Sequence, residues 1–545
     1  MKGLMQDRPL TLTHIFSRAE QMFGDARVIT AGDEADKVTS VRDWSVRVRR
    51  LAAAFDALGA SDDARIGTLA MNSQAHLEAY YAAPITGRIL HTINMRLTAD
   101  HLAFVINHAE DEIVIVDRGL AHLLEDVLHR VPTVAHWIVV DDGSGAPLPP
   151  GAVFLDYEEL LAATPPHEGR FEVRDENRAS GLCYTSGTTG DPKGVLYSHR
   201  STVLHSLGQL GVDSLGIREA DIVMPIVPMF HVNAWGLPYA AMLAGADLVL
   251  PARSTQPAQL LSLMERHGVT MAAAATTVWN FAAPYLGDFD LSSLRMVMSG
   301  GSATPSALSE AWRERAGIPI THSWGMTEIS PVAVIGGVRA ADGDASEERK
   351  AELRALQGRP VPMVELRLVD DDGDELPWDG EAVGEVQVAG PWVASGYYRR
   401  ESEGMTDDGW LRSGDLGAID PLGYLRIVDR VKDIIKSGGE WISSVDLENA
   451  IMSHPDIMEA AVVGRPDEKW AERPVAYVVG RDGALLTAEL VREHLRPLVA
   501  RWWLPEDIVF LAELPKTGSG KFSKTELRRL WQVTVEGAEP EGPRL

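Results

Sequence analysis

The chain has 545 residues and a formal net charge of −27. This length exceeds what one hydrophobic core usually supports, so at least two domains are expected. The acidic balance disfavours general binding to nucleic acid or to anionic membranes. Binding of an anionic substrate would therefore depend on a few Lys and Arg side chains in the site itself.

A single cysteine, Cys183, excludes a disulfide within the chain and fits a reducing compartment, so we expect a cytoplasmic protein. Cys183 lies in an apolar run without a base nearby in sequence, which favours a buried structural thiol over a nucleophile. The N-terminal residues lack the apolar core of a signal peptide. The longest apolar stretch, residues 234–250, is broken by Gly, Pro and Asp247, so no membrane-spanning segment is expected.

Up to about residue 340, short apolar runs alternate with amphipathic segments. Expected strands are Ile113–Val116, Trp137–Val140, Ile222–Val227, Leu248–Leu250, Met271–Ala275 and Leu294–Met298. Expected helices are Pro257–His267 and Pro305–Ala316. This alternation predicts an α/β fold with largely parallel sheets.

After about residue 340, Asp- and Gly-rich turns separate short alternating runs such as Glu365–Val369 and Glu385–Val388, which predicts antiparallel hairpins. From about residue 429 the mixed pattern returns. Expected there are helices Ser444–His454 and Ala488–Leu495 and strands Glu459–Val463 and Val475–Val479. We predict a large N-terminal domain, residues 1–430, made of α/β subdomains and a β-rich part at about 340–430. A small mobile C-terminal α+β domain, residues 431–545, would follow.

The most informative segment is YTSGTTGDPKGVLYSH, residues 184–199. Two apolar runs frame a loop rich in glycines and hydroxyls that also contains Lys193. Such a loop can place backbone N–H groups, hydroxyls and one ammonium against phosphate oxygens. It is not a Walker A loop, because the glycine-to-lysine spacing differs and no Ser or Thr follows the lysine. A flexible surface linker is the disfavoured alternative.

This segment resembles the phosphate-loop signature of the adenylate-forming superfamily, which contains acyl-CoA synthetases, peptide-synthetase adenylation domains and luciferases. Six further segments resemble that superfamily's motifs in the expected order: PMFHVNAWG from Pro228, GGSATP from Gly300, HSWGMTE from His322, SGD from Ser413, VDRVKDIIKSGGEWIS from Val428 and PKTGSGK from Pro515. The resemblance implies an enzyme that uses ATP to convert a carboxylate to an acyl-adenylate and then to an acyl-CoA. ATP, Mg²⁺ and coenzyme A are the expected cofactor and substrates.

The resemblance also implies a nucleotide site. Its residues are Thr185, Ser186, Gly187, Thr188, Thr189, Gly190, Lys193, Gly301, Ser302, Ala303, His322, Ser323, Trp324, Gly325, Met326, Thr327, Glu328, Asp415, Arg430 and Lys521. Glu328 and Thr185 are expected to bind Mg²⁺, a hard cation that takes oxygen ligands together with substrate phosphates. Trp324 is expected near the adenine, Asp415 as acceptor of both ribose hydroxyls, and Arg430 at the ribose or phosphates.

Expected catalytic residues are Lys521, Glu328, Thr185 and His231. Lys521, in a glycine-rich turn, would orient the carboxylate and stabilise charge during attack on the α-phosphate. The implied acyl pocket consists of His231, Val232, Trp235, Gly300, Gly301 and Pro331. Trp235 resembles the tryptophan that gates the tunnel of bacterial fatty acyl-CoA synthetases. A core histidine at 231 and a core tryptophan at 235 are the alternatives.

The last implied element is a hinge at Lys432 with a segment that shapes the coenzyme A channel. Its residues are Lys432, Lys436, Ser437, Gly438, Gly439, Glu440 and Trp441. Rotation about the hinge would let Lys521 and this segment take turns at one site. Thr276 stands where many relatives have proline, so an altered wall of the acyl pocket is expected.

The identity of the acyl group stays open. Medium- and long-chain fatty acyl-CoA synthetases and 3-methylmercaptopropionate-CoA ligases carry similar motifs. A peptide-synthetase domain is disfavoured, since no carrier domain follows Lys521, while luciferase chemistry is not excluded by the motifs. A catalytically silent nucleotide-binding relative is the alternative from a different class. By analogy with bacterial long-chain relatives, a homodimer formed through the N-terminal domain is possible.

Overall fold

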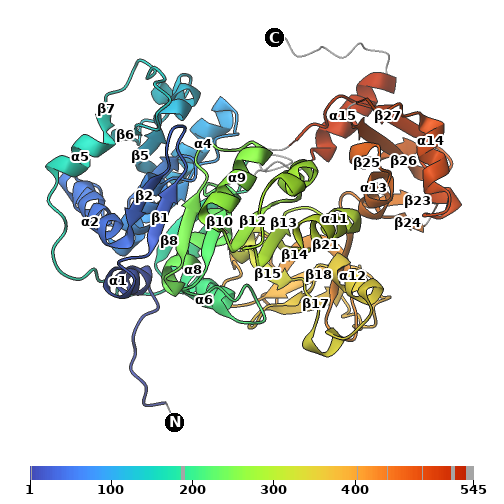
Figure 1. The fold of residues 1–545 in the computed structure, drawn as a ribbon, viewed down its shortest axis with the longest axis horizontal. Coiled ribbons are helices and arrows are strands. Elements are labelled where there is room, and N and C mark those ends of the chain that lie inside the picture. The colour runs from blue at the N-terminus through green and yellow to red at the C-terminus, as the bar shows by residue number, and fades with distance from the viewer. Residues whose placement is uncertain are drawn as a thin grey trace.

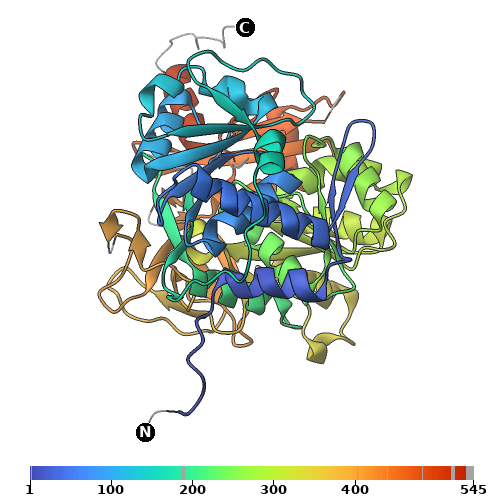
Figure 2. The same ribbon diagram turned by 90° about the vertical axis from the view of Figure 1, so that its left-hand side faces the viewer.

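The computed structural model describes residues 1, 3–185, 191–401, 403–438, 440–481, 483–516 and 522–535. A large N-terminal part contains two broad sheets and a β-rich subdomain, and a small C-terminal part lies at one side of it (Figure 1). Turning the molecule by 90° brings the first helices, α1 (Leu12–Met22) and α2 (Val41–Ala57), to the front (Figure 2).

A seven-stranded sheet, in the order β7-β6-β5-β3-β4-β8-β9, forms one half of the N-terminal part. All its pairings are parallel except that of β8 with β9. Its strands are β3 (Arg65–Leu69), β4 (Ile89–Thr92), β5 (Asp111–Asp117), β6 (His136–Val140), β7 (Phe154–Asp156), β8 (Ala179–Tyr184) and β9 (Gly194–Ser198). The helices α3 (Gln74–Ile85), α4 (Ala99–Ala109) and α5 (Tyr157–Ala163) belong to this half.

A nine-stranded sheet, in the order β16-β15-β14-β13-β12-β10-β11-β1-β2, forms the other half. Its strands are β1 (Arg27–Thr30), β2 (Lys37–Ser40), β10 (Ile222–Pro225), β11 (Asp247–Leu250), β12 (Met271–Ala275), β13 (Met296–Gly300), β14 (Ile320–Gly325), β15 (Val332–Ile335) and β16 (Arg359–Pro360). Its helices are α6 (His199–Leu210), α7 (Val232–Trp235), α8 (Leu237–Ala244), α9 (Pro257–His267), α10 (Thr276–Ala282), α11 (Ser306–Ala316) and α12 (Glu347–Ala355).

Strand periodicity explains how these two sheets are covered on both faces. Successive side chains of a strand point to opposite faces, so a strand buried on both sides supplies two cores. In β5, Ile113 and Ile115 belong to the large core shared by both sheets, whereas Val114 and Val116 pack into a separate core with α4. In β12, Met271 and Ala272 divide in the same way between that large core and a core beneath α9 and α11.

The β-rich subdomain has a four-stranded antiparallel sheet, β17 (Glu365–Val369), β18 (Gly384–Ala389), β21 (Leu411–Ile419) and β22 (Leu425–Arg430), and a hairpin, β19 (Gly396–Tyr397) and β20 (Arg400–Glu401). The C-terminal part has a five-stranded sheet, β23 (Ile435–Ser437), β24 (Glu440–Ile442), β25 (Ile457–Asp467), β26 (Ala471–Gly480) and β27 (Asp507–Phe510). Helices α13 (Ser444–Met452), α14 (Ala488–Leu495) and α15 (Lys524–Val535) complete it.

The predicted fold class is confirmed, and helices α9 and α14 have the predicted bounds. Several predicted strands have other bounds in the structure, and two of them end or begin differently for a visible reason. β13 begins at Met296 rather than Leu294, because pairing with β12 starts at Met271 opposite Met296. β10 ends at Pro225, because the N–H groups of Ile226 and Val227 both donate to the carbonyl of Ala273 and so break the regular ladder.

The domain boundary between residues 430 and 431 stays a prediction; it falls between β22 and β23. The residues after 535 lie outside the described part of the chain. None of the helices in the described ranges has both the length and the apolar character needed to cross a bilayer.

A largely buried ionic cluster connects β22 to the C-terminal helices. The Lys524 ammonium lies 2.9 Å from Glu448 Oε1 and donates to the Ser444 hydroxyl. Asp429, at the end of β22, accepts hydrogen bonds of 2.6 Å from both the N–H and the hydroxyl of Ser444. Lys524 therefore neutralises carboxylates that are withdrawn from water on either side of the predicted boundary.

We expect Lys524→Met to destabilise the C-terminal part by about 3 kcal/mol, because Glu448 and Asp429 would stay buried without their cation. Arg496→Met, which breaks an exposed ion pair with Glu489 in the same part, should cost less than about 1 kcal/mol. Hydrogen exchange of the amides in α13 and β25 measures both changes. Equal protection in the two variants would contradict this assignment.

Candidate active site

Four of the seven segments singled out in the sequence lie at the carboxyl ends of strands in the two large sheets. The phosphate loop follows β8, PMFHVNAWG follows β10, GGSATP begins at the end of β13, and GMTE begins at the end of β14. In open α/β sheets the crevice at these ends is where ligands bind. Segments that are far apart in the sequence are therefore brought together in the fold.

A cavity of about 310 Å³ lies at this convergence. Fifteen of the predicted site residues line it: Thr185, Lys193, His231, Val232, Trp235, Gly300, Gly301, Ser323, Trp324, Gly325, Met326, Thr327, Glu328, Pro331 and Arg430. The cavity is also lined by four residues that were not among the predicted site residues: Asp191, Met298, Val332 and Tyr397. Polar side chains that suit phosphate and metal and apolar side chains that suit an acyl chain thus line one cavity.

The phosphate loop connects two antiparallel strands, β8 and β9, as its apolar flanks predicted. At its base the N–H of Thr185 donates to the carbonyl of Lys193 at 2.9 Å, and the N–H of Lys193 donates to the Thr185 hydroxyl at 3.3 Å. The Lys193 ammonium bonds Glu403 at 2.5 Å and lies 4.9 Å from the centre of the Tyr397 ring. The predicted residues 186–190 lie outside the described part of the chain.

Glu328 is buried beside the same loop. The Tyr397 hydroxyl donates to Glu328 Oε1 at 2.6 Å, and the Tyr197 hydroxyl donates to the carbonyl of Thr327 at 2.7 Å. Burial, reinforced by the Glu328 charge, raises the pKa of Tyr397 far above its usual value, so its hydroxyl keeps its proton and acts as a donor.

Magnesium would fit the oxygen donors present here. Glu328 and the Thr185 hydroxyl line the first cavity, and both offer the hard oxygen ligands that Mg²⁺ prefers. Within the described residues, no group of three or more His, Cys, Asp or Glu side chains is arranged to hold a metal ion. One carboxylate suits Mg²⁺ that arrives bound to substrate phosphates, not a dedicated protein cage.

A second cavity of about 860 Å³ adjoins the first and reaches the C-terminal part. The predicted residues that line it are Gly301, Ser302, Ala303, His322, Ser323, Trp324, Gly325, Asp415, Arg430 and Lys432. Burial lowers the pKa of His322 to about 4, so its ring is neutral near pH 7. Its Nε2 lies 3.3 Å from the carbonyl oxygen of Ser302.

Asp415 contacts two other residues that line this cavity, Arg430 and Trp324. Its Oδ1 lies 2.7 Å from Arg430 Nε, and its Oδ2 accepts the Trp324 indole N–H at 2.8 Å. The Asp415 carboxylate raises the pKa of Arg430, which remains charged. Thr276, expected at the acyl pocket, instead lines the second cavity, where its hydroxyl lies 2.9 Å from that of Ser299.

The acyl side of the first cavity rests on a backbone turn of unusual conformation. Val232, Asn233, Ala234 and Trp235 all have left-handed φ angles, between 47° and 57°. For L-residues this conformation costs roughly 1–2 kcal/mol each, and strain of this kind gathers at functional sites. The turn sets the Trp235 indole against Gly300, where an added Cβ would lie 3.1 Å from the ring.

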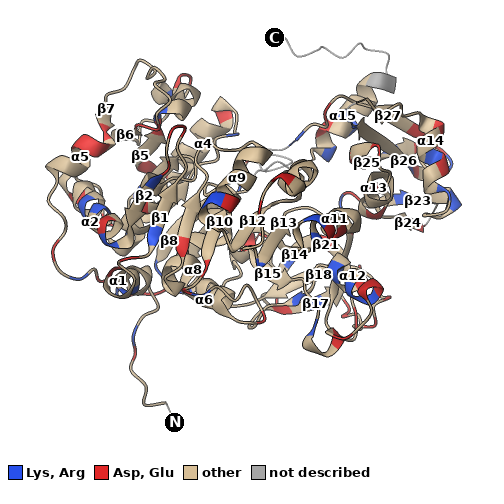
Figure 3. Cartoon of the chain, viewed as in Figure 1, with Lys and Arg blue, Asp and Glu red and all other residues tan. Residues whose placement is uncertain are grey.

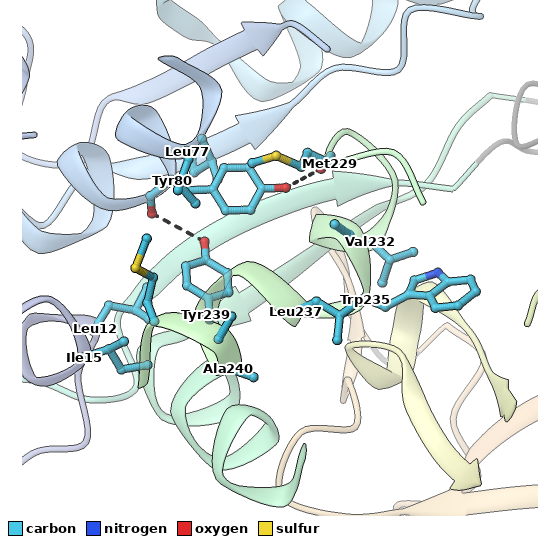
Figure 4. Packing of buried hydrophobic residues seen from close by; sticks show 14 of the residues in the cluster. Leu12, Ile15, Leu77, Tyr80, Met229, Val232, Trp235, Leu237, Tyr239 and Ala240 are labelled. Carbon is cyan, nitrogen blue, oxygen red and sulfur yellow. Dashed lines mark hydrogen bonds between the residues drawn. The ribbon is translucent and has the colours of Figure 1, made fainter. Parts of the chain in front are cut away.

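Buried polar contacts hold this turn in place. The Cys183 thiol donates to Asn233 Oδ1 at 3.3 Å, and Gln209 donates to the carbonyl of Trp235 at 2.6 Å. The predicted structural role of Cys183 is confirmed, and burial raises the pKa of its thiol to about 11. Figure 4 shows Val232 and Trp235 within a cluster of buried hydrophobic residues in which the Tyr80 hydroxyl donates to the carbonyl of Met229.

The C-terminal part turns one side toward the cavities. Lys516 and Phe522 pair as an isolated β-bridge, and Phe522 and Lys524 line the second cavity. Lys521 lies between Lys516 and Phe522 in the sequence and is outside the described residues, as is Gly439. Five residues of the predicted coenzyme A segment lie in or beside the β23–β24 hairpin and line neither of the two cavities: Lys436, Ser437, Gly438, Glu440 and Trp441.

Comparison with known proteins identifies the family. The model of the AMP-binding enzyme family matches residues 16–398, and that of the AMP-binding enzyme C-terminal domain matches residues 446–521. The chain belongs to the AMP-binding enzyme family. Similar members include a long-chain-fatty-acid–CoA ligase of Thermus thermophilus, 45% identical over 98% of each chain. A 3-methylmercaptopropionyl-CoA ligase of Ruegeria lacuscaerulensis is 40% identical over 98% of this chain and 100% of its own.

A solved structure of an anthranilate CoA ligase with anthranoyl-AMP shares the fold of this AMP-binding enzyme. Its TM-score is 0.86 at 26% identity, over 98% of this chain and 100% of that one. The match spans both parts of the chain, so it supports the arrangement of the C-terminal part as well as the sheets.

A pair of substitutions tests the strain in this AMP-binding enzyme. Ala234→Gly and Ala240→Gly each remove one buried methyl group, but Ala234 has a φ of 48° whereas Ala240 lies in regular helix α8. Glycine relieves strain at the first position and weakens a helix at the second. We expect Ala240→Gly to be more destabilising by about 1–2 kcal/mol in chemical unfolding. An equal loss would contradict a strained turn.

Proposed function

We propose that this protein is an AMP-forming acyl-CoA synthetase. The observation that carries the proposal is the first cavity, in which Thr185, Lys193, Glu328 and Arg430 lie beside the apolar side chains of Val232 and Trp235. A phosphate and metal site next to an apolar pocket is what the activation of a fatty or related carboxylic acid by ATP requires. The relatives named as CoA ligases support the same activity.

In the first half-reaction, a carboxylate oxygen of the acid attacks the α-phosphorus of ATP, and the bond to the β-phosphate breaks. The products are an acyl-adenylate and pyrophosphate. Arg430 and Lys193 are the described cations of the cavity that would meet the phosphates, and Asp415 would accept the ribose hydroxyls. Bound Mg²⁺, held by Glu328 and Thr185, would supply charge neutralisation at the phosphates.

In the second half-reaction, the thiol of coenzyme A attacks the acyl carbon, and the bond to AMP breaks. We propose that rotation at Lys432 exchanges the side that carries Lys521 for the β23–β24 hairpin. Phe522, the residue after Lys521 in the sequence, lines the second cavity. This position supports assigning the structure to the arrangement in which the adenylate forms. Lys432 lies between β22 and β23 and lines the second cavity, a position that supports a hinge between the two parts.

We expect Lys521→Ala to slow adenylate formation by about 100-fold or more, since it would remove the cation that stabilises charge at the α-phosphate. The rate of thioester formation from supplied acyl-AMP should stay within a few-fold of the wild type. In that step the β23–β24 hairpin would replace the side that carries Lys521 at the site. Pyrophosphate release and coenzyme A consumption report the two steps separately. Equal loss in both would rule out this role.

We infer that the substrate is a medium- or long-chain fatty acid, since the 45% identical relative of Thermus thermophilus is named for long-chain fatty acids. A cavity of about 310 Å³ is at the lower end for small-molecule sites and must also admit phosphates, so a longer chain needs the space that Trp235 occupies. The alternative substrate is 3-methylmercaptopropionate, a short acid that would need less of that space. The relative of Ruegeria lacuscaerulensis named for this activity favours that alternative.

Pyrophosphate release with acids from propionate to palmitate, including 3-methylmercaptopropionate, distinguishes these substrates. For a fatty acyl-CoA synthetase we expect kcat/KM to rise with chain length. Trp235→Ala should raise the ratio of long-chain to short-chain kcat/KM, because long chains would no longer have to displace the indole. An unchanged ratio would refute a gating role. A complete lack of pyrophosphate release with every acid would favour the silent nucleotide-binding alternative.

Two finer features also stay proposals. The lone, buried cysteine is compatible with a cytoplasmic location. A homodimer is proposed only by analogy with the bacterial relatives, and sedimentation of the full chain tests it.

A further inference from the structure

Tyr397 is a site residue that no sequence motif indicated. It lies on β19 and lines the first cavity between the candidate metal ligand Glu328 and the phosphate-loop lysine Lys193. Its hydroxyl donates to Glu328 Oε1 at 2.6 Å, and its ring centre lies 4.9 Å from the Lys193 ammonium. One side chain thus contacts a residue from each of the two groups that would hold MgATP.

The backbone around Tyr397 is tied to the same two elements. The N–H of Tyr398 donates to the carbonyl of Gly194 at 2.8 Å, next to Lys193. The N–H of Ala394 donates to the carbonyl of Glu328 itself at 2.7 Å. The segment that carries Tyr397 is therefore fixed to the end of the phosphate loop on one side and to Glu328 on the other.

We propose that Tyr397 is a positioning residue with two separable roles: its hydroxyl orients Glu328 for Mg²⁺, and its ring positions Lys193 for the phosphates of ATP. This inference rests on the proposed function. A hydrogen bond to one oxygen of a metal-binding carboxylate fixes its orientation, and loss of such a bond typically weakens metal binding 10–100-fold. A cation above the ring face is attracted by its quadrupole and keeps a defined place.

The charge on Lys193 makes the second role specific. Its ammonium also bonds Glu403, whose side chain is 42% exposed. Triphosphate can replace the Glu403 carboxylate as the anionic partner, while the aromatic ring can stay in place during that exchange. The ring would therefore keep Lys193 near the loop both before and after ATP binds.

The test uses Mn²⁺ as a spectroscopic probe of the metal site, with a non-hydrolysable ATP analogue. For Tyr397→Phe, which keeps the ring, we expect Mn²⁺ affinity in the ternary complex to fall about 10-fold. The KM for ATP at saturating Mg²⁺ should change less than about 3-fold. Tyr397→Leu, which also removes the ring, should raise that KM further. Tyr398→Phe, on the neighbouring residue of the same segment, is the matched control and should change neither quantity.

A double-mutant cycle with Glu328→Gln asks whether the hydroxyl acts through the carboxylate. In the Glu328→Gln background, Tyr397→Phe should weaken Mn²⁺ binding by less than about 2-fold. Independent, multiplicative losses would overturn the proposal, as would wild-type Mn²⁺ affinity in Tyr397→Phe. Matching unfolding temperatures of the variants exclude a general loss of structure. If the wild type released no pyrophosphate with any acid, the proposed function would fail, whereas the Mn²⁺ measurement would still decide the role of the hydroxyl.

Discussion

The site depends on one constraint: a single buried carboxylate, that of Asp415, accepts donors from two parts of the fold. Trp324 comes from β14 of the nine-stranded sheet, and Arg430 comes from the last residue of β22. Two charge-assisted hydrogen bonds to a buried acceptor define its geometry far more strongly than exposed contacts would. These hydrogen bonds join the nine-stranded sheet to the β-rich subdomain. Arg430 precedes the candidate hinge, Lys432, by two residues. A rotation at the proposed hinge would therefore leave these two hydrogen bonds intact.

Much of this organisation follows from the sequence, for identifiable reasons. Strands buried on both faces, such as Met271–Ala275, read as continuous apolar runs, so their positions and the α/β class were predictable. Four of the seven motifs could be placed together because they lie at the carboxyl ends of β8, β10, β13 and β14. Strand ends were less predictable, since the end of β10 depends on the bonds that Ile226 and Val227 make to β12, which no local pattern encodes.

The missed residues share a property. Tyr397 reaches Glu328 across 69 positions, and its own neighbourhood, Gly396 to Arg400, has no spacing that indicates chemistry. Asn72 donates to the carbonyls of Pro225 and Val227 and so shapes the segment before His231. No motif in the sequence around Asn72 indicates this role. Side chains that orient others are selected by distant partners. Their roles become visible only when those partners are brought together.

Anion binding by so acidic a chain has a local explanation. Residues of both charges are interspersed over the outer helices and the C-terminal part (Figure 3). At physiological ionic strength, charges more than about 8 Å apart in solvent are largely screened, so the net charge of −27 acts weakly on a ligand in the cavity.

What matters is the immediate surroundings of each cation: Lys193 is paired with Glu403, and Arg430 with Asp415. These pairs are not equivalent, because Glu403 is 42% exposed while Asp415 is buried and also bonded to Trp324. Glu403 can yield its place to a phosphate and return to water, whereas Asp415 cannot leave without stranding Arg430 and Trp324. In the proposed nucleotide site, a phosphate would therefore displace the carboxylate at Lys193, whereas the ribose would share the carboxylate at Arg430.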